Sequence, residues 1–308
     1  VRFRRTLDCT PFDGTELGEE LYNLRELPPS NVIFGLANMS VLDSVRIFAQ
    51  VPGWMNIVAG IVARYVLDIP ARLKSSRDRR LTMGNALVGG LYAQAKRNGV
   101  RILLNTPVVD LIHENGRVQG VVCRTATGEQ RRYKASRGVV VASGGFEKNP
   151  ALREKYLPNP TSTDWTVGSE GNTGDLIAPV SGVGAKLGLM HEAWWAPTVK
   201  GATGPIALFF EKSKPNMMIV DRHGRRFMNE SITYNSYGQE MYRREKDGQA
   251  AGVPAFVIFD ANYRAKYPFA GLIQGQFMPD WLTPATFKPG GTLKKANSLP
   301  ELAAALGI

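Results

Sequence analysis

The feature that most constrains the fold of this 308-residue chain is the pattern of residues 82–146, where a helix is followed by apolar runs and a glycine pair. Five apolar residues repeat at the spacing of one helix face: Leu87, Val88, Leu91, Tyr92 and Ala95. Asn85 is a suitable N-cap, and Gly99 can end the helix in a left-handed conformation. The sequence therefore predicts an amphipathic helix over about residues 85–98.

Apolar runs at 100–104, 108–112 and 117–123 follow this helix and predict strands. Asn115-Gly116 stands between the last two runs and favours a type I′ turn, so these runs form a predicted hairpin. A second turn at Thr127-Gly128 leads into polar residues. The order predicts a helix, a strand and then a meander of antiparallel strands.

The segment GVVVASGGF at 138–146 ends this pattern. Its run from Val139 to Ala142 predicts a strand buried on both faces, as in a parallel sheet covered by helices. Ligands of open α/β sheets bind at the carboxyl ends of strands. Gly144 and Gly145 stand at that end and would let a ring or a pyrophosphate approach the backbone. A purely structural turn is the alternative interpretation.

Elsewhere the pattern is less specific. Residues 1–30 predict loops and turns, and residues 41–50 and 54–67 predict two helices. The most apolar stretch, 54–73, is interrupted by Arg64, Asp68 and Pro70, so we expect no membrane-spanning helix.

Charge and cysteine content narrow the possible functions. The chain has 38 Lys and Arg against 27 Asp and Glu, a net charge of +11, but the surplus is spread over short groups. This favours an anionic cofactor or substrate over a nucleic acid. Cys9 and Cys123 are isolated, which predicts a reducing compartment. His113, His191 and His223 have no metal-ligand spacing, so no metal is expected.

Several motifs in a fixed order make the chain similar to a known family. They are RLTMGNALVGGLYAQAKRNGVRILLNTPVVDLIHENGRVQGVVC, GVVVASGGFEKNP, GNTGD, GLMHEAWWAP and DRHGRRFMNESITY. In these motifs the chain resembles FAD-dependent 3-ketosteroid dehydrogenase-like flavoproteins of the fumarate reductase flavoprotein superfamily. The resemblance implies an α/β fold, with a Rossmann-like FAD-binding domain that contains an antiparallel β-meander and an inserted α+β substrate domain.

The resemblance implies FAD as the cofactor and suggests which residues contact it. They are Gly84, Asn85, Ala86, Leu87, Val108, Ala142, Ser143, Gly144, Gly145 and Asp175. The start of a helix offers backbone N–H groups and a partial positive charge, which suit phosphates or the electron-rich edge of the flavin. For Asp175, a role as N-cap of the next helix is an open alternative. Leu176 replaces an expected glycine and would crowd the cofactor.

The resemblance assigns catalysis to Tyr234. Fumarate reductases have an arginine at this position, which suits dicarboxylates, whereas a phenol offers an apolar ring and one proton-transferring oxygen. Trp194 and Trp195 also match the steroid branch and could line a substrate pocket, with core packing as the alternative. His191 stands where that branch more often has an acidic residue and is assigned no role.

The implied function is dehydrogenation of a 3-ketosteroid or a similar cyclic ketone. Tyr234 would take the α-proton while hydride passes to FAD, and an external electron acceptor would reoxidise the cofactor. Two alternatives stay open: a non-catalytic fragment, or a flavin-dependent reductase of unsaturated acids. Neither a nucleic acid nor an integral membrane partner is expected.

The resemblance also implies domain limits. Residues 1–190 would form the FAD-binding domain without its N-terminal GxGxxG strand, and 191–308 a substrate domain truncated at its C-terminus. The chain starts with Val1 instead of Met, which fits a truncated sequence. We expect a cytoplasmic protein and leave a peripheral association with membranes open.

Overall fold

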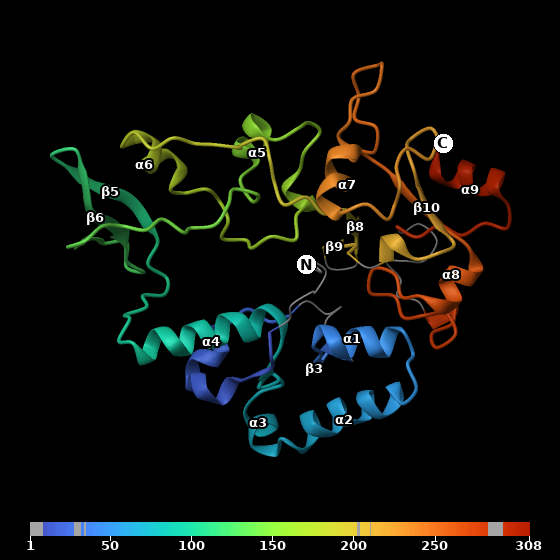
Figure 1. Cartoon of the computed structure of the whole chain (residues 1–308), viewed down its shortest axis with the longest axis horizontal. Coiled ribbons are helices and arrows are strands. Elements are labelled where there is room, and N and C mark those ends of the chain that lie inside the picture. Colours follow the sequence, from blue (N-terminus) through green and yellow to red (C-terminus); the bar gives the residue numbers. More distant parts are fainter. Residues whose placement is uncertain (1–8, 28–31, 34, 202–203, 210, 283–291) are drawn as a thin grey trace, which may run out of the picture. The chain divides into compact units, whose positions relative to one another are not determined.

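Helices alternate with short antiparallel strands in a computed structural model, which describes residues 9–27, 32–33, 35–201, 204–209, 211–282 and 292–308 (Figure 1). The chain divides into two compact units, Val1–Ile102 and Leu103–Ile308. The basic residues 2–5 and the pair Pro28-Pro29 lie outside the described residues.

The first unit is mainly helical. Its elements are β1 (Phe12–Asp13), the 3-10 helix η1 (Gly14–Asn23), β2 (Val32–Ile33), β3 (Ala37–Asn38), α1 (Val41–Phe48), α2 (Trp54–Leu67), α3 (Ile69–Lys74), β4 (Arg80–Leu81) and α4 (Met83–Arg97). Strand β1 pairs with β4, and β2 pairs with β3, both antiparallel. The helices predicted at 41–50 and 54–67 are confirmed as α1 and α2. The prediction that residues 1–30 form loops and turns was wrong in part, because β1 and η1 form within this segment.

Helix α4 packs through its small residues. Ala86, Gly89 and Ala93 are buried against a core that includes Leu81, whereas the predicted core residues Leu87, Val88 and Leu91 are exposed. A Cβ at Gly89 would lie 2.8 Å from Leu81 Cδ1, so the helix backbone lies too close to that core for larger side chains. Three residues of the expected apolar face are therefore exposed in the described unit, whereas Tyr92 of that face packs against this core.

The two ends of α4 differ in how well they match the expected caps. The N-cap is Thr82 and not Asn85, whose side-chain amide instead donates to the carbonyl of Arg25 at 2.9 Å. At the other end Gly99 has φ +73°, as predicted for a left-handed residue that ends the helix.

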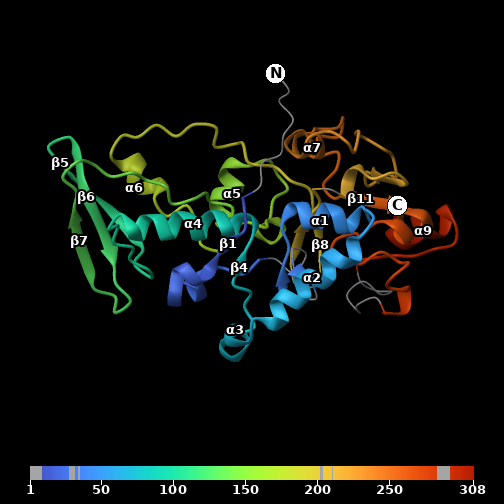
Figure 2. The same ribbon diagram turned by 60° about the horizontal axis from the view of Figure 1, so that its bottom comes forward.

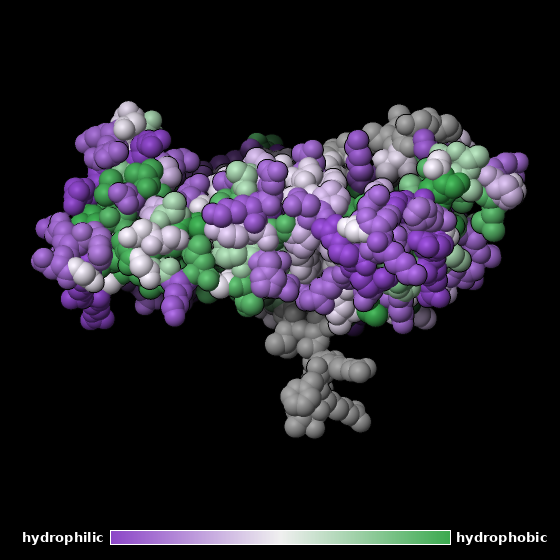
Figure 3. Space-filling model, turned by 90° about the horizontal axis from the view of Figure 1, so that it is seen from above, coloured by the Kyte–Doolittle hydropathy of each residue, from purple (hydrophilic) through white to green (hydrophobic). Residues whose placement is uncertain are grey.

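The second unit contains more strands. Its elements are β5 (Val108–Glu114), β6 (Arg117–Arg124), β7 (Gln130–Lys134), α5 (Pro150–Tyr156), η3 (Thr163–Trp165), α6 (Ile177–Gly182), β8 (Thr198–Lys200), β9 (Pro205–Ala207), η4 (Glu211–Ser213), β10 (Met217–Val220), α7 (Tyr234–Met241), β11 (Phe256–Phe259), α8 (Ala261–Lys266), η5 (Asp280–Leu282) and α9 (Leu299–Leu306). Strand β8 pairs with β9, and β10 pairs with β11, both antiparallel. Figure 3 shows apolar residues among polar ones on one face of the molecule.

The predicted meander is confirmed by the three-stranded antiparallel sheet β5-β6-β7 (Figure 2). Glu114 pairs with Arg117, so the loop between β5 and β6 is the two-residue turn Asn115-Gly116. Both turn residues have positive φ, 51° and 71°, as a type I′ turn requires. The second predicted turn is also present, since Gly128 N–H donates to Thr125 O at 2.9 Å.

The strands predicted at 100–104 and 139–142 do not form in the described part of the chain. Val140 is 91% exposed and Val141 is 42% exposed, instead of being buried on both faces. A strand exists only where a neighbour accepts its ladder hydrogen bonds, and no described strand lies in register with either run.

Candidate active site

The glycine pair at 144–145 packs against the GNTGD motif, and both lie in the second unit. Gly174 N–H donates to Gly145 O at 3.1 Å. A Cβ at Gly144 would lie 2.4 Å from Asn172 Oδ1, and Gly144 has φ +80°, so only glycine fits there without strain. The structure thus brings together two motifs that are separate in the sequence and that were both assigned to the cofactor.

Hydrogen bonds from Asn172 and Asn149 hold this junction. Asn172 Nδ2 donates to Glu147 Oε1 at 2.5 Å, and Asn149 Nδ2 donates to Thr173 O at 2.9 Å. Asn149 is also the N-cap of α5, where its side chain accepts from the backbone N–H of Leu152. Hydrogen bonds to residues 147, 149 and 173 therefore hold the backbone next to the 144–145 bend in place.

Asp175 is exposed next to this junction and accepts from Thr173 Oγ1 at 2.7 Å. Helix α6 begins at Ile177 with Leu176 as its N-cap, so Asp175 does not cap that helix. Leu176 is buried. Its side chain therefore packs within the second unit.

The other predicted cofactor residues of this unit differ in exposure, since Val108 is half-buried whereas Ala142 and Ser143 are exposed. Val108 begins β5 opposite Cys123, and the preceding carbonyl of Pro107 accepts from Arg124 N–H at 2.9 Å. Ala142 and Ser143 are exposed in extended chain just before the bend. Their backbone is open to a ligand.

The first unit holds the remaining predicted cofactor residues in the first turn of α4. A side chain added at Gly84 would meet no atom within 4 Å, and Leu87 is half exposed. Thr82 just before them is buried, and its hydroxyl has no hydrogen-bond partner among the described residues. The open space at Gly84 and the unsatisfied hydroxyl fit a large polar ligand at this helix end.

Tyr234 is the first residue of α7. The helix is capped by Thr233, whose hydroxyl accepts from Ser236 N–H. The Tyr234 side chain is 50% exposed, and its ring meets the Phe209 ring edge to face at 5.6 Å between centroids. The phenol is therefore available to a substrate while its ring has a packing partner.

A buried polar network precedes Tyr234. The Glu230 carboxylate accepts from Arg226 and from the Ile219 N–H at 3.0 Å. Burial acts to raise the pKa of Glu230, but the hydrogen bonds from Arg226 and Ile219 together hold it below its ordinary value of 4.5. Lys212 Nζ donates to the carbonyls of Glu230 and Ile232. Sequence reasoning missed Lys212, because nothing in the sequence distinguishes it from the exposed Lys214.

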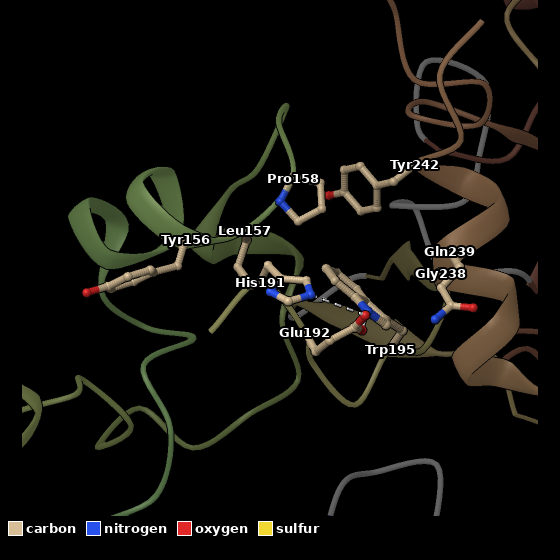
Figure 4. Close-up of a pocket in the computed structure, with 9 residues that line it drawn as sticks. All are labelled: Tyr156, Leu157, Pro158, His191, Glu192, Trp195, Gly238, Gln239 and Tyr242. Atoms are coloured by element: carbon tan, nitrogen blue, oxygen red, sulfur yellow. Dashed lines mark hydrogen bonds and ion pairs between the residues drawn. The ribbon is translucent and has the colours of Figure 1, made fainter. Parts of the chain in front are cut away.

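The two adjacent tryptophans, Trp194 and Trp195, have different environments. Trp194 is fully exposed, which contradicts the alternative that it is a core aromatic. Trp195 stacks obliquely on Tyr242 and lies against Gly238 of α7, where an added Cβ would meet it at 2.3 Å. Trp195 lines a cavity of about 420 Å³ between α5 and α7 (Figure 4). His191 and Glu192 also line it, with 3.9 Å between their Nε2 and Oε1 atoms.

His223 has no metal-ligand spacing in the sequence, but the structure brings it close to Glu245 and Asp247. Both carboxylates already accept from Arg222, at 2.9 and 2.8 Å. Arg225 also bonds Glu245. These guanidinium groups neutralise the carboxylates, so the cluster is a set of ion pairs that ties residues 221–225 to 245–247.

Comparison with known proteins defines the class. The family described as FAD binding domain matches residues 1–291, and the chain belongs to this family. FAD is therefore the cofactor, as the resemblance implied. The open space at Gly84 in the first unit and the glycine bend at 144–145 in the second unit are each, taken separately, compatible with contact to such a group.

Individual relatives narrow the resemblance. The chain is 37% identical to 3-oxosteroid 1-dehydrogenase of Mycolicibacterium smegmatis over 99% of its length and 53% of that protein. It is 33% identical to 4-oxocyclohexanecarboxylate 2-dehydrogenase of Sinomonas cyclohexanicum, over 99% of its length and 51% of that protein. The chain spans about half the length of the curated relatives it matches.

A solved structure supports the fold class. The crystal structure of 3-ketosteroid delta1-dehydrogenase from Sterolibacterium denitrificans, in complex with 1,4-androstadiene-3,17-dione, matches with a TM-score of 0.90 and 37% identity. The match covers 98% of this chain and 54% of that one. The mixed α/β flavoprotein fold expected from the sequence is thus confirmed.

None of the described helices is long and apolar enough to cross a bilayer.

Proposed function

We propose that this chain carries part of the FAD site and the proton acceptor of a dehydrogenase that acts beside the carbonyl of a 3-ketosteroid or a similar cyclic ketone. The observation that carries the proposal is Tyr234, a half-exposed phenol fixed at the start of α7. The relatives support the substrate class, because both 3-oxosteroids and 4-oxocyclohexanecarboxylate are ring ketones.

In the proposed reaction, the phenolate oxygen of Tyr234 removes the proton from the carbon next to the carbonyl and becomes the neutral phenol. The neighbouring carbon loses a hydride, that is, a hydrogen together with its bonding electron pair. A double bond then forms between the two carbons. Bound FAD would supply the acceptor for this hydride. The substrate thus loses one proton and one hydride, and an external electron acceptor, which we include in the proposal, must later remove the two electrons.

The cofactor contacts are part of the same proposal. They comprise Gly84, Asn85, Ala86, Leu87, Val108, Ala142, Ser143, Gly144, Gly145 and Asp175. The open surface at 140–143 and at Gly84 supports them. Trp195, which lines the cavity beside α7, and the exposed Trp194 are both proposed as residues of the substrate pocket.

We also propose that residues 1–190 form the FAD-binding domain and 191–308 the substrate domain. The proposed boundary at residue 190 falls inside the second compact unit, which begins at Leu103. The proposed domains are therefore defined by the resemblance and not by the division at residue 102. The free thiols of Cys9 and Cys123 support a reducing compartment such as the cytoplasm.

The direct test is anaerobic mixing of the FAD-loaded protein with 4-androstene-3,17-dione. Loss of the visible flavin absorbance, with formation of one desaturated product per flavin, is expected. An unchanged spectrum with this steroid and with 4-oxocyclohexanecarboxylate would exclude the function. Turnover of fumarate with reduced flavin would instead favour a reductase.

A further inference from the structure

Lys212 is a buried lysine that the proposed reaction does not use. It lies in η4 and is 4% exposed. Its ammonium has no carboxylate partner among the ion pairs of the described residues, and burial lowers its pKa. A buried charge without a counter-ion is costly unless its donors are hydrogen-bonded. The contacts of this ammonium therefore indicate its role.

Those contacts converge on the chain just before Tyr234. Lys212 Nζ donates to Glu230 O at 3.1 Å and to Ile232 O at 2.5 Å. It also lies 5.3 Å from the centroid of the Tyr237 ring, within the range of a cation–π contact. Tyr237 is almost fully buried, one helical turn after Tyr234. One ammonium thus fixes the backbone on the N-terminal side of Tyr234 and a ring on the C-terminal side.

We propose that Lys212 is a positioning residue for the proton acceptor. It fixes the entry of the chain into α7, and this sets where the Tyr234 oxygen meets the substrate. The inference rests on the proposed function of Tyr234 and adds the group that controls its placement. Charge-assisted bonds to two carbonyls suit this task, because they resist the small displacements to which a proton transfer is sensitive.

Lys212→Met tests the proposal, because methionine keeps the approximate shape and removes the charge and the donors. We expect kcat to fall on the order of 10²-fold, the cost of a roughly 1 Å misplacement, with KM nearly unchanged. Lys214→Met is the matched control, since Lys214 is exposed two residues away, and it should keep the wild-type kcat. A wild-type kcat in Lys212→Met would overturn the proposal.

Hydrogen exchange provides a readout without turnover. In Lys212→Met the backbone amides of residues 234–238 should exchange faster, while those of the β5-β6-β7 sheet keep their wild-type rates. A uniform increase throughout the second unit would mean that Lys212 serves general stability, and it would contradict the positioning role. If wild-type protein oxidises no ketone but this local effect is present, the proposed function fails and the Lys212 contact stands.

A third measurement does not depend on a folded variant. In wild-type protein labelled with ¹⁵N-lysine, the Lys212 ammonium protons should exchange with water much more slowly than those of Lys214. Equal rates would show that the two carbonyl bonds do not persist in solution, and the proposal would be wrong.

Discussion

Gly144 shows at the scale of one residue why the bend of the candidate site needs glycine. Its φ of +80° is strained for any residue with a Cβ, and a Cβ would also meet Asn172 Oδ1 at 2.4 Å. Gly116 has a similar φ of +71° but open space around it. A comparison of substitutions at Gly144 and Gly116 therefore distinguishes the cost of backbone strain from the cost of the clash with Asn172.

We expect Gly144→Ala to lower the free energy of unfolding by about 1–3 kcal/mol from backbone strain, with a further loss from the clash. Gly116→Ala should cost about 1–2 kcal/mol, the backbone term alone. Urea unfolding of both variants measures the difference. Equal losses would show that the bend does not pack on Asn172.

Glu230 leads to a prediction about pH. Its folded-state pKa is lowered, so it contributes stability above its unfolded value near 4.5, and this contribution is lost as the pH falls through the lower folded-state pKa. Glu230→Gln should therefore be less stable than wild type at pH 7, with a difference that shrinks in acid. Unfolding at pH 7 and at about pH 3 checks this.

The control for this measurement is Glu240→Gln. Glu240 pairs with Arg243 on the surface of α7, where an ion pair contributes little. Its variant should stay close to wild type at both pH values. A Glu230→Gln difference independent of pH would show that the carboxylate charge is not the cause.

Helix α4 shows at the scale of an element where sequence reasoning fails. The helix itself and its end at Gly99 were predictable, because spacing and C-terminal glycine are local signals. Its buried face was not, because the spacing of the large residues Leu87 and Leu91 does not show that the small residues Ala86, Gly89 and Ala93 are the buried ones. The face is decided by how closely the backbone approaches Leu81, and that distance depends on tertiary packing.

Two adjacent glycines of α4 test this packing. A Cβ at Gly89 would lie 2.8 Å from Leu81 Cδ1, whereas a Cβ at Gly90 would meet Phe12 Cδ2 at an ordinary contact distance of 3.8 Å. Both alanine variants gain about 1 kcal/mol of helix propensity. We expect Gly90→Ala to raise the thermal midpoint and Gly89→Ala to lower it. A stabilised Gly89→Ala would mean that α4 packs more loosely than described.

The strands show the same division between local and distant signals. The turn at Asn115-Gly116 set the β5–β6 pairing correctly, because a two-residue turn fixes its own register. The run at 139–142 was predicted as a buried strand from its composition. A strand also needs an adjacent strand that shares its ladder hydrogen bonds, and the composition of one segment does not show whether such a strand is present. The exposure of Val140 is the result.

For the whole molecule, the family and its cofactor could be predicted from co-ordered motifs, and the FAD binding domain match confirms both. The contact between the 144–145 bend and Asn172 could not be predicted, since the spacing of two motifs carries no information on their distance. Lys212 could not be identified either, because its role depends on carbonyls of a distant segment. Function therefore has to be argued from the site and not from the fold alone.

The central claim is that the Tyr234 oxygen takes the substrate proton. The most direct measurement is the anaerobic rate of flavin reduction by 4-androstene-3,17-dione in Tyr234→Phe, with Tyr65→Phe as control, whose hydroxyl donates to Ser76 O at 2.6 Å in the first unit. Loss of a general base should slow Tyr234→Phe by about 10²–10⁴-fold and leave the control close to wild type. A Tyr234→Phe variant that reduces its flavin at the wild-type rate would contradict the account.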